Sequence, residues 1–194
     1  MQSELRPAAA TAVAATRRGP ARTQNPGIVC RRVRSTRERA DHLAVRHQVF
    51  VDEQGVFADS DVDWRDAEIS TIALLGHRNG IVVGTVRLFP LDATTRLWQG
   101  DRLAVLAPYR TLGAGAPLVR CAVATAAALG GITMTAHIQP ANITFFQRLG
   151  WTPAGERETY AGLPHQPMSI DLPSRSEGLA TVRRLEAGIT ERGR

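Results

Sequence analysis

The most distinctive chemistry in the chain lies in Ala104–Gly115, where an arginine and two glycines stand between an expected strand and an expected helix. The unpaired N–H groups and the dipole of a helix start attract anions, and glycines let a bulky diphosphate approach the backbone. A Walker loop is excluded because no Lys-Ser/Thr follows the last glycine, and the dinucleotide fingerprint is excluded because Leu118 replaces its third glycine. The remaining pattern, Arg110-x-x-Gly113-x-Gly115, predicts a diphosphate-binding loop.

A second motif follows about thirty residues later, at Asn142–Trp151, with an initial asparagine, two adjacent phenylalanines and a final Gly-Trp pair. Together the two stretches resemble the signatures of the GNAT superfamily of N-acyltransferases. These are the acyl-CoA pyrophosphate loop Gln/Arg-x-x-Gly-x-Gly/Ala after a strand, and Asn-x-x-(aromatic)-Tyr-x-x-x-Gly-aromatic. The resemblance covers residues 28–172, and Arg46–Gly55 with Gly162–His165 and Met168 further resembles a small bacterial subgroup.

The resemblance implies a fold, a donor and a binding site. The fold is a single α/β domain with a mixed, mostly antiparallel central sheet of about six to seven strands flanked by helices. The donor is acetyl-CoA, and a primary amine of a small molecule attacks its thioester directly, with no metal involved. An N–H near Leu106 would polarise the thioester carbonyl. The residues implied to bind the donor are Leu103 and Val105 through their backbone, Arg110, Thr111, Leu112, Gly113, Ala114, Gly115 and Ala116 around the diphosphate, and Asn142 and Phe146 near the pantetheine arm.

The catalytic groups depart from the family pattern at one position. Phe146 stands where the family often has a tyrosine that protonates the departing thiolate, and a phenyl ring has no proton to donate. Tyr160 is a candidate substitute; otherwise water acts, or the thiolate leaves unassisted, since a thiol of pKa about 8.5 is a fair leaving group. Glu53 is the first candidate for the general base because it follows the helix that covers the acceptor side in the family fold. His137, at a strand end, is the second candidate, and His165 is the third.

The acceptor side is suggested by charge. Residues 52–68 contain seven carboxylates and only one arginine, Arg65. Such a run would attract a cationic amine, although it is equally typical of a solvated acidic loop. The carboxylates are those of Asp52, Glu53, Asp59, Asp61, Asp63, Asp66 and Glu68.

Two other functions are compatible with the sequence. The first is that of an acyl-homoserine-lactone synthase, an enzyme with the same fold that uses an acyl carrier protein, although the Arg-x-x-Gly-x-Gly loop is the CoA form and argues against it. The second is a catalytically silent acyl-CoA sensor or assembly subunit, which would bind CoA without releasing thiol. The resemblance to the synthases rests on Arg46-x-x-x-Phe50, Asp61, Asp63, Asp66 and Arg87.

Hydrophobic periodicity predicts a hairpin-rich mixed α/β domain whose strands and helices interleave in its second half. Ser35 or Thr36, with Glu38 nearby, predicts a helix start, and Asn79-Gly80 predicts a hairpin turn. The expected strands are 28–33, 69–75, 81–89, 102–106, 133–137 and 168–172, and the expected helices are 39–51, 116–129 and 142–149.

Composition places these elements in one domain. The chain has 194 residues, and we expect a folded unit at 27–172 after a disordered leader at 1–26. A polar tail follows at 173–194, which could be helical in part, at 179–189. The net charge of +6 lies mostly on these two tails, which argues against a nucleic-acid partner.

The remaining expectations concern the protein's surroundings. The longest uncharged stretch, 121–148, is interrupted by glycines, a proline and polar residues, which excludes a membrane span. Cys30 and Cys121 lack any metal-ligand spacing and are expected to be buried, reduced thiols. We therefore expect a cytoplasmic bacterial enzyme without a metal, and a homodimer is compatible with the sequence.

Overall fold

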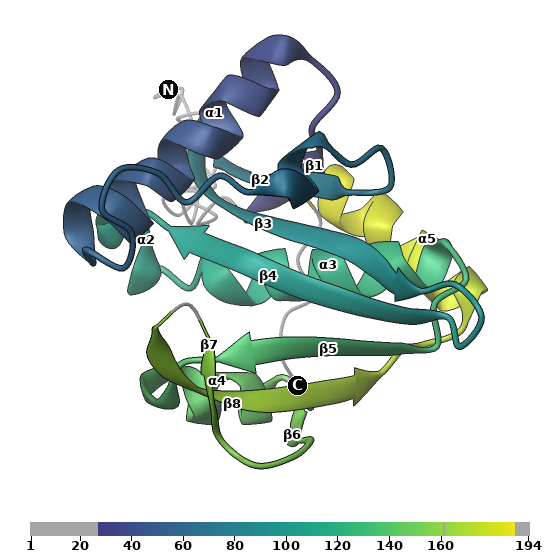
Figure 1. Cartoon of the computed structure of the whole chain (residues 1–194). Coiled ribbons are helices and arrows are strands. Elements are labelled where there is room, and N and C mark those ends of the chain that lie inside the picture. The colour runs from purple at the N-terminus through teal and green to yellow at the C-terminus, as the bar shows by residue number, and fades with distance from the viewer. Residues whose placement is uncertain (1–26, 161, 189–194) are drawn as a thin grey trace, which may run out of the picture.

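The computed structural model describes residues 27–160 and 162–188 (Figure 1). Their strands form one eight-stranded sheet in the order β1-β2-β3-β4-β5-β8-β6, and β7 pairs with β8. Every neighbouring pair is antiparallel except β4 and β5, which are parallel. The predicted fold class, a mixed and mostly antiparallel α/β domain, is confirmed. The sequence-predicted leader, residues 1–26, lies outside the described residues.

The strands and helices alternate along the chain much as the periodicity predicts. The strands are β1 (Val29–Arg32), β2 (Ile72–Arg78), β3 (Ile81–Asp92), β4 (Leu97–Val105), β5 (Thr133–Ile138), β6 (Thr152–Pro153), β7 (Glu158–Tyr160) and β8 (Leu163–Asp171). The helices are α1 (Thr36–His47), which continues into the π-helical turn η1 (Gln48–Glu53), the short 3₁₀ turns η2 (Trp64–Ala67) and η3 (Pro140–Asn142), and α2 (Ala107–Arg110), α3 (Gly115–Ala128), α4 (Ile143–Arg148) and α5 (Arg175–Glu186).

Short sequence motifs determine where α1 begins and where the chain turns between β2 and β3. The Ser35 side chain accepts a hydrogen bond from the Glu38 N–H, and Glu38 reaches back to the cap, so the predicted helix start is a capping box at Ser35. Asn79 and Gly80 both have positive φ, 52° and 79°, as the predicted two-residue hairpin turn between β2 and β3 requires.

The two faces of the sheet are covered by different helices. On β3, Thr85 bonds to His42 of α1, whereas a Cβ on its neighbour Gly84 would meet Leu118 of α3. Because successive strand residues point to opposite faces, α1 covers one face and α3 the other. The main core lies on the α3 face and includes Leu88, Leu118 and other fully buried side chains.

The stretch expected to be a polar tail contains α5, which packs beside α3. A Cβ on Gly178 would lie 2.7 Å from the Ala128 backbone nitrogen, so the two helices approach as closely as a glycine permits. Leu185 is buried in the main core, and the Arg175 guanidinium donates to the Ala128 carbonyl. Helix α5 is therefore part of the folded unit.

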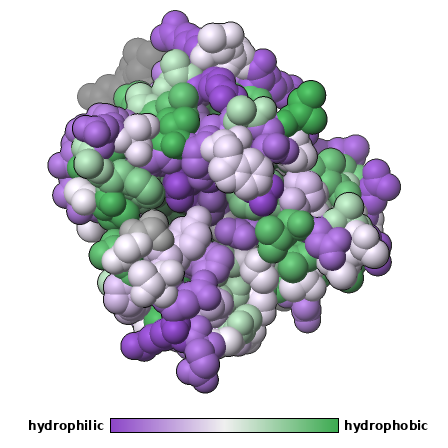
Figure 2. All heavy atoms as spheres, in the orientation of Figure 1, coloured by the Kyte–Doolittle hydropathy of each residue, from purple (hydrophilic) through white to green (hydrophobic). Residues whose placement is uncertain are grey.

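Apolar residues on the surface are scattered. On the face shown in Figure 2, hydrophobic side chains occur in small groups among hydrophilic ones, which is ordinary for a folded domain. Among the residues that the structure describes, no helix has both the length and the apolar character needed to cross a bilayer.

Candidate functional site

The central feature of the site is the divergence of β4 from β5. The two strands pair only through Leu97–Gln99 and Thr133–Thr135, and Figure 1 shows them moving apart beyond that point. A β-bulge contributes to the bend, because Arg102 and Leu103 together oppose the single residue Val86 of β3, and Arg102 has a φ of 49°. Beyond Gln99, β4 therefore offers its backbone to an extended ligand instead of to β5.

A cavity of about 150 Å³ lies in this opening. It is bounded by η1 and the loop after it, by β4, β5 and α3, and by the α4, β7 and β8 region. Three residues that the sequence suggested for catalysis, His137, Tyr160 and His165, line it, and so do the expected donor-binding residues Leu103, Asn142 and Phe146. The structure thus brings together groups that are up to 62 positions apart in the chain.

The predicted diphosphate loop lies between α2 and α3. Gly113 has a φ of 76°, and its N–H donates to the Arg110 carbonyl, while the Ala114 N–H donates to the Tyr109 carbonyl. These two N–H groups are therefore engaged within the loop. Helix α3 starts at Gly115 without a side-chain cap, so the N–H groups of its first turn have no helical partner and are suited to an anion.

The oxyanion donor that the family resemblance implies near Leu106 is not the Leu106 N–H itself. The Leu106 N–H donates to the Val83 carbonyl at 3.0 Å. Because this bond joins the end of β4 to β3, the Leu106 N–H cannot also polarise a thioester carbonyl. The Val105 carbonyl is engaged as well, by the Arg110 side chain at 2.9 Å.

Arg110 and Glu53 are paired with each other. Both guanidinium Nη atoms donate to the Glu53 carboxylate, and each side chain is 39% exposed. The hydrogen bonds from Arg110 lower the pKa of Glu53 below its usual value. A carboxylate with a lowered pKa is a weaker proton acceptor, and Arg110 points to Glu53 and the Val105 carbonyl. Their predicted roles, base and diphosphate ligand, stay predictions.

His137 pairs through only one of its two ring nitrogens within the described residues. Its Nε2 lies 2.7 Å from a carboxylate oxygen of Glu158 on β7, and its Nδ1 is buried with no hydrogen-bond partner among the described residues. In the neutral ring, Nε2 carries the hydrogen that the carboxylate accepts, which leaves a lone pair on Nδ1. Sequence reasoning missed Glu158, because a three-residue strand gives no periodic signal.

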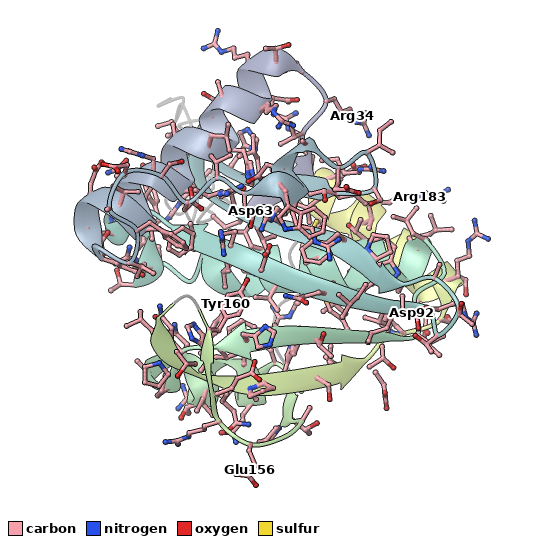
Figure 3. All side chains as sticks on the ribbon, in the orientation of Figure 1. Arg34, Asp63, Asp92, Glu156, Tyr160 and Arg183 are labelled. Atoms are coloured by element: carbon pink, nitrogen blue, oxygen red, sulfur yellow. The ribbon has the colours of Figure 1, made fainter. Side chains whose placement is uncertain are left out.

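Tyr160 and His165 pack around His137. The Tyr160 ring stacks on the imidazole with 4.6 Å between centroids and 3° between planes, and His165 meets Tyr160 edge-on. In Figure 3 Tyr160 lies at the gap between the β1–β4 part of the sheet and the β5–β8 part. The His165 Nδ1 forms a hydrogen bond with the Leu163 carbonyl. Because both residues belong to β8, this bond fixes the His165 ring on that strand.

The second motif forms the side of the cavity next to α4. Phe146 is 6% exposed and meets Phe145 and Trp151 edge-on, which is core packing. The Trp151 Nε1 is a buried donor without a partner among the described residues. Two residues that line the cavity, His137 and Trp151, therefore have an unsatisfied polar atom, which a bound ligand could pair.

The acidic stretch is not the open surface that its sequence suggests. Three of its carboxylates, Asp61, Asp63 and Asp66, bind arginines from α1, β3 and β4, and Asp61 and Asp66 are buried. The prediction that the stretch attracts a cationic amine is wrong for these three, because arginines already neutralise them. We call the complete set the ion-pair network: Arg46, Arg87, Arg102, Asp61, Asp63, Asp66 and Asp101.

The network fixes the protonation of its members. Burial opposes the charged form of Asp66, but hydrogen bonds from Arg46 and the Asp63 N–H outweigh this and lower its pKa. Burial and the nearby Arg46 charge lower the pKa of His42 to about 3. Arg46 donates to His42 Nε2, so Nδ1 carries the hydrogen that bonds to Thr85 at 2.6 Å.

Comparison with known proteins agrees with the fold and the motifs. Residues 38–151 match the sequence model of the Acetyltransferase (GNAT) family. The chain belongs to this family, whose members are acyl-CoA-dependent acyltransferases, and it is accordingly an acyltransferase. The uncharacterized N-acetyltransferase YjcF of Bacillus subtilis is 28% identical over 132 residues, which are 68% of this chain and 91% of YjcF.

Solved structures show the same fold. Escherichia coli ElaA superposes with a TM-score of 0.65 at 23% identity, covering 73% of this chain and 98% of ElaA. BjaI, a CoA-dependent acyl-homoserine lactone synthase, superposes with a TM-score of 0.60 at 19% identity, covering 84% of this chain and 90% of BjaI. Within the described residues, no cluster of three or more His, Cys, Asp or Glu could hold a metal ion.

Proposed function

We propose that the chain transfers an acyl group, in the simplest case the acetyl group of acetyl-CoA, to a primary amine of a small molecule by direct attack on the thioester. The observation that supports this most strongly is the position of His137. It lines the cavity between β4 and β5, and its buried Nδ1 has no hydrogen-bond partner among the described residues, so an amine that reached this nitrogen would meet a free lone pair.

His137 serves as the general base in this proposal. An amine is protonated at neutral pH and attacks only after it loses a proton. Glu158 accepts the hydrogen on Nε2, which orients the ring and stabilises the imidazolium that forms when Nδ1 takes up the proton. Glu53 remains the alternative base, but its pairing with Arg110 weakens that case.

The donor is held from two sides. Its diphosphate lies at the loop before α3, where the N–H groups of Gly115 and Ala116, and Arg110 once it leaves Glu53, face the negative charge. In the proposal, residues 111–114 form the turn that brings these N–H groups to the diphosphate. The pantetheine amides pair with the open backbone of β4 near Leu103 and, once Arg110 releases its carbonyl, near Val105, beside Asn142 and Phe146.

Tyr160 is the candidate to protonate the departing thiolate, since Phe146 cannot. Tyr160 lines the same cavity and is held against His137 by ring stacking. Its hydroxyl carries the proton that the phenyl ring of Phe146 lacks.

The test is release of free thiol from acetyl-CoA in the presence of polyamines, amino acids, aminoglycosides and arylamines. We expect one amine class to stimulate release, and His137→Gln to lower kcat about a hundredfold and remove the pH dependence due to the base. His47→Gln, at an exposed histidine of α1, is the matched control. CoA binding without thiol release from any amine would instead support the silent acyl-CoA sensor.

A second candidate function is that of an acyl-homoserine-lactone synthase. The observation that favours it is the ion-pair network, which unites the synthase-like residues Arg46, Asp61, Asp63, Asp66 and Arg87. The structure of BjaI contains SAM and isopentyl-CoA. Thiol release with SAM as the acceptor, from an acyl carrier protein or from acyl-CoA, would favour this candidate over a simple amine.

A further inference from the structure

The three arginines of the ion-pair network differ in how completely their N–H groups are used. All three nitrogens of Arg46 and of Arg87 donate hydrogen bonds, at 2.5–3.0 Å. Arg102 donates only from Nε and Nη2, to the Asp61 carbonyl and the Asp63 carboxylate, at 3.2–3.3 Å. Its Nη1, which carries two N–H groups, has no hydrogen-bond partner among the described residues.

Arg102 is also the arginine of the network that borders the cavity between β4 and β5. It lines this cavity, whereas Arg46 and Arg87 do not. Its side chain is only 9% exposed, and its guanidinium lies 5.0 Å from the ring centroid of Phe57, which lines the cavity as well. A buried N–H group without a partner costs stability, so the free end of Arg102 calls for an acceptor from a bound molecule.

The β-bulge in β4 brings Arg102 to the same face of the sheet as its neighbour Asp101. Asp101 bonds to Arg87 on the α1 face, whereas Leu103 packs against the main core on the α3 face. Arg102 is the extra residue between them, with a φ of 49°, and it bonds to the network on the α1 face. Two adjacent side chains of opposite charge therefore lie on one face, which regular alternation would prevent.

Asp101 and His137 stand on the two arms of the opening. Each lies two residues beyond the last paired residues of β4 and β5, Gln99 and Thr135, and each lines the cavity. Asp101 is the one aspartate of the network that does so, and the network has four aspartates for three arginines, with His42 held neutral by its lowered pKa. The excess negative charge favours an ammonium group at this end of the cavity.

We propose that the acyl acceptor is a free α-amino acid, whose carboxylate accepts hydrogen bonds from Arg102 Nη1 while its amine lies between Asp101 and His137. This inference rests on the proposed function and specifies its acceptor. An amine without a carboxylate would leave the two N–H groups of Nη1 unpaired. An α-amino acid carries both charges on one carbon and so matches the adjacent Asp101 and Arg102.

The reaction balances with these groups. The amine nitrogen forms the new C–N bond to the acyl carbon as the thioester C–S bond breaks. Of the two protons that the ammonium loses, His137 Nδ1 takes one before the attack, and the departing thiolate takes up the other. The products are the N-acyl amino acid and the free thiol of CoA, with one proton left on His137.

The first experiment compares each L-amino acid with the amine that its decarboxylation gives, for example leucine with isopentylamine and phenylalanine with phenethylamine. Thiol release from acetyl-CoA is followed with the full chain. We expect kcat/KM for the preferred amino acid to exceed that of its matched amine at least tenfold, because the amine lacks the charged partner of Arg102. Matched amines that react as well as the amino acids would overturn the inference while leaving the proposed function in place. If neither class released thiol, both would fail.

The second experiment changes Arg102 itself. Arg102→Lys keeps a positive charge beside Asp61 and Asp63, but a single ammonium nitrogen cannot serve both the network and a ligand. We expect the ratio of kcat/KM for the amino acid to that for its matched amine to fall at least tenfold. Arg65→Lys is the matched control, because Arg65 also stacks on aromatic rings but does not line the cavity.

Two results of the second experiment would overturn the inference. One is a folded Arg102→Lys variant with the wild-type ratio. The other is an equal loss of kcat/KM for the amino acid and for its amine, because Arg102 would then act on the thioester donor instead of the acceptor. Thermal unfolding shows whether the variant is folded, and the comparison of amino acids with amines in the unchanged protein decides the matter if it is not.

Discussion

The α1 face of the sheet and the opening between β4 and β5 differ in whether their buried polar groups have partners. On the α1 face, three arginines and four aspartates are buried or half-buried and pair with one another. In the opening, His137 Nδ1 and Trp151 Nε1 are buried and have no hydrogen-bond partner among residues 27–160 and 162–188. Asp63, labelled in Figure 3, belongs to the first region, and Tyr160 to the second.

We infer that the paired groups contribute to stability and that the unpaired groups contribute to function. A buried charge whose partners are all present has no hydrogen-bonding capacity left for a ligand. Removing one partner leaves the other charge unpaired in a medium of low polarity. A buried polar atom without a partner costs stability, and it persists where a ligand completes it. We therefore expect changes in the ion-pair network to affect folding, and changes in the opening to affect binding and rate.

The largest expected effect is that of Arg87→Ala. Arg87 is fully buried and binds Asp63, Asp66 and Asp101, so its loss leaves buried carboxylates unpaired. We expect the free energy of unfolding to fall by about 3–5 kcal/mol, measured by urea denaturation. The exposed Arg37→Ala is the control and should cost less than about 0.5 kcal/mol. If Arg87→Ala lowered the free energy of unfolding by less than about 1 kcal/mol, the ion-pair network would not be the region that stabilises the fold.

A smaller effect concerns pH and His42. Its pKa in the folded state is about 3, below the unfolded value of about 6.5, so the unfolded chain binds the extra proton first as the pH falls. Stability is then lost below pH 6.5, and we expect a decrease of about 2 kcal/mol by pH 5. His42→Gln should remove most of this slope between pH 7 and 5, when unfolding is followed at each pH, and leave the part due to His77, whose pKa burial also lowers. An unchanged slope in the variant would show that His42 is not the group that titrates.

The acidic residues of the network act in a lower pH range. The pKa values of Asp63 and Asp66 are lowered in the folded state, so their contribution is present above about pH 4 and is lost as the pH falls further. The two pH ranges therefore distinguish His42 from the carboxylates.

The smallest expected effect is at the exposed Glu53–Arg110 pair, which belongs to neither region. In Glu53→Gln the Arg110 guanidinium is free to meet the diphosphate, and we expect the Kd of CoA to fall about two- to fivefold, more at low salt. Asp52→Asn is the control, because this carboxylate is next to Glu53 and contacts His47 instead. If kcat fell a hundredfold and the Kd did not change, Glu53 would be the base after all.

Much of the fold follows from local signals in the sequence. The capping box at Ser35, the turn at Asn79-Gly80 and the helix bounded by two glycine pairs are specified by neighbouring residues, so they could be predicted. The start of β4 could not be predicted, because apolar and polar residues do not alternate in Trp98-Gln99-Gly100. The strands β6 and β7 are too short to produce one.

The site was predictable only where a motif is contiguous. The Arg110–Gly115 motif does precede a helix start, as predicted, whereas the Glu158–His137 contact depends on a pairing between β7 and β8 that no local pattern specifies. In the same way, nothing in the sequence indicates that arginines from three elements meet the acidic stretch.

The packing of α5 has a practical consequence for truncated versions of the protein. A chain cut after Leu172, where composition alone sets the boundary, would uncover the alanine-rich side of α3 that Gly178 now approaches. A newly exposed apolar strip of that kind favours self-association, so such a fragment would precipitate or form aggregates even though every residue of the catalytic opening is still present.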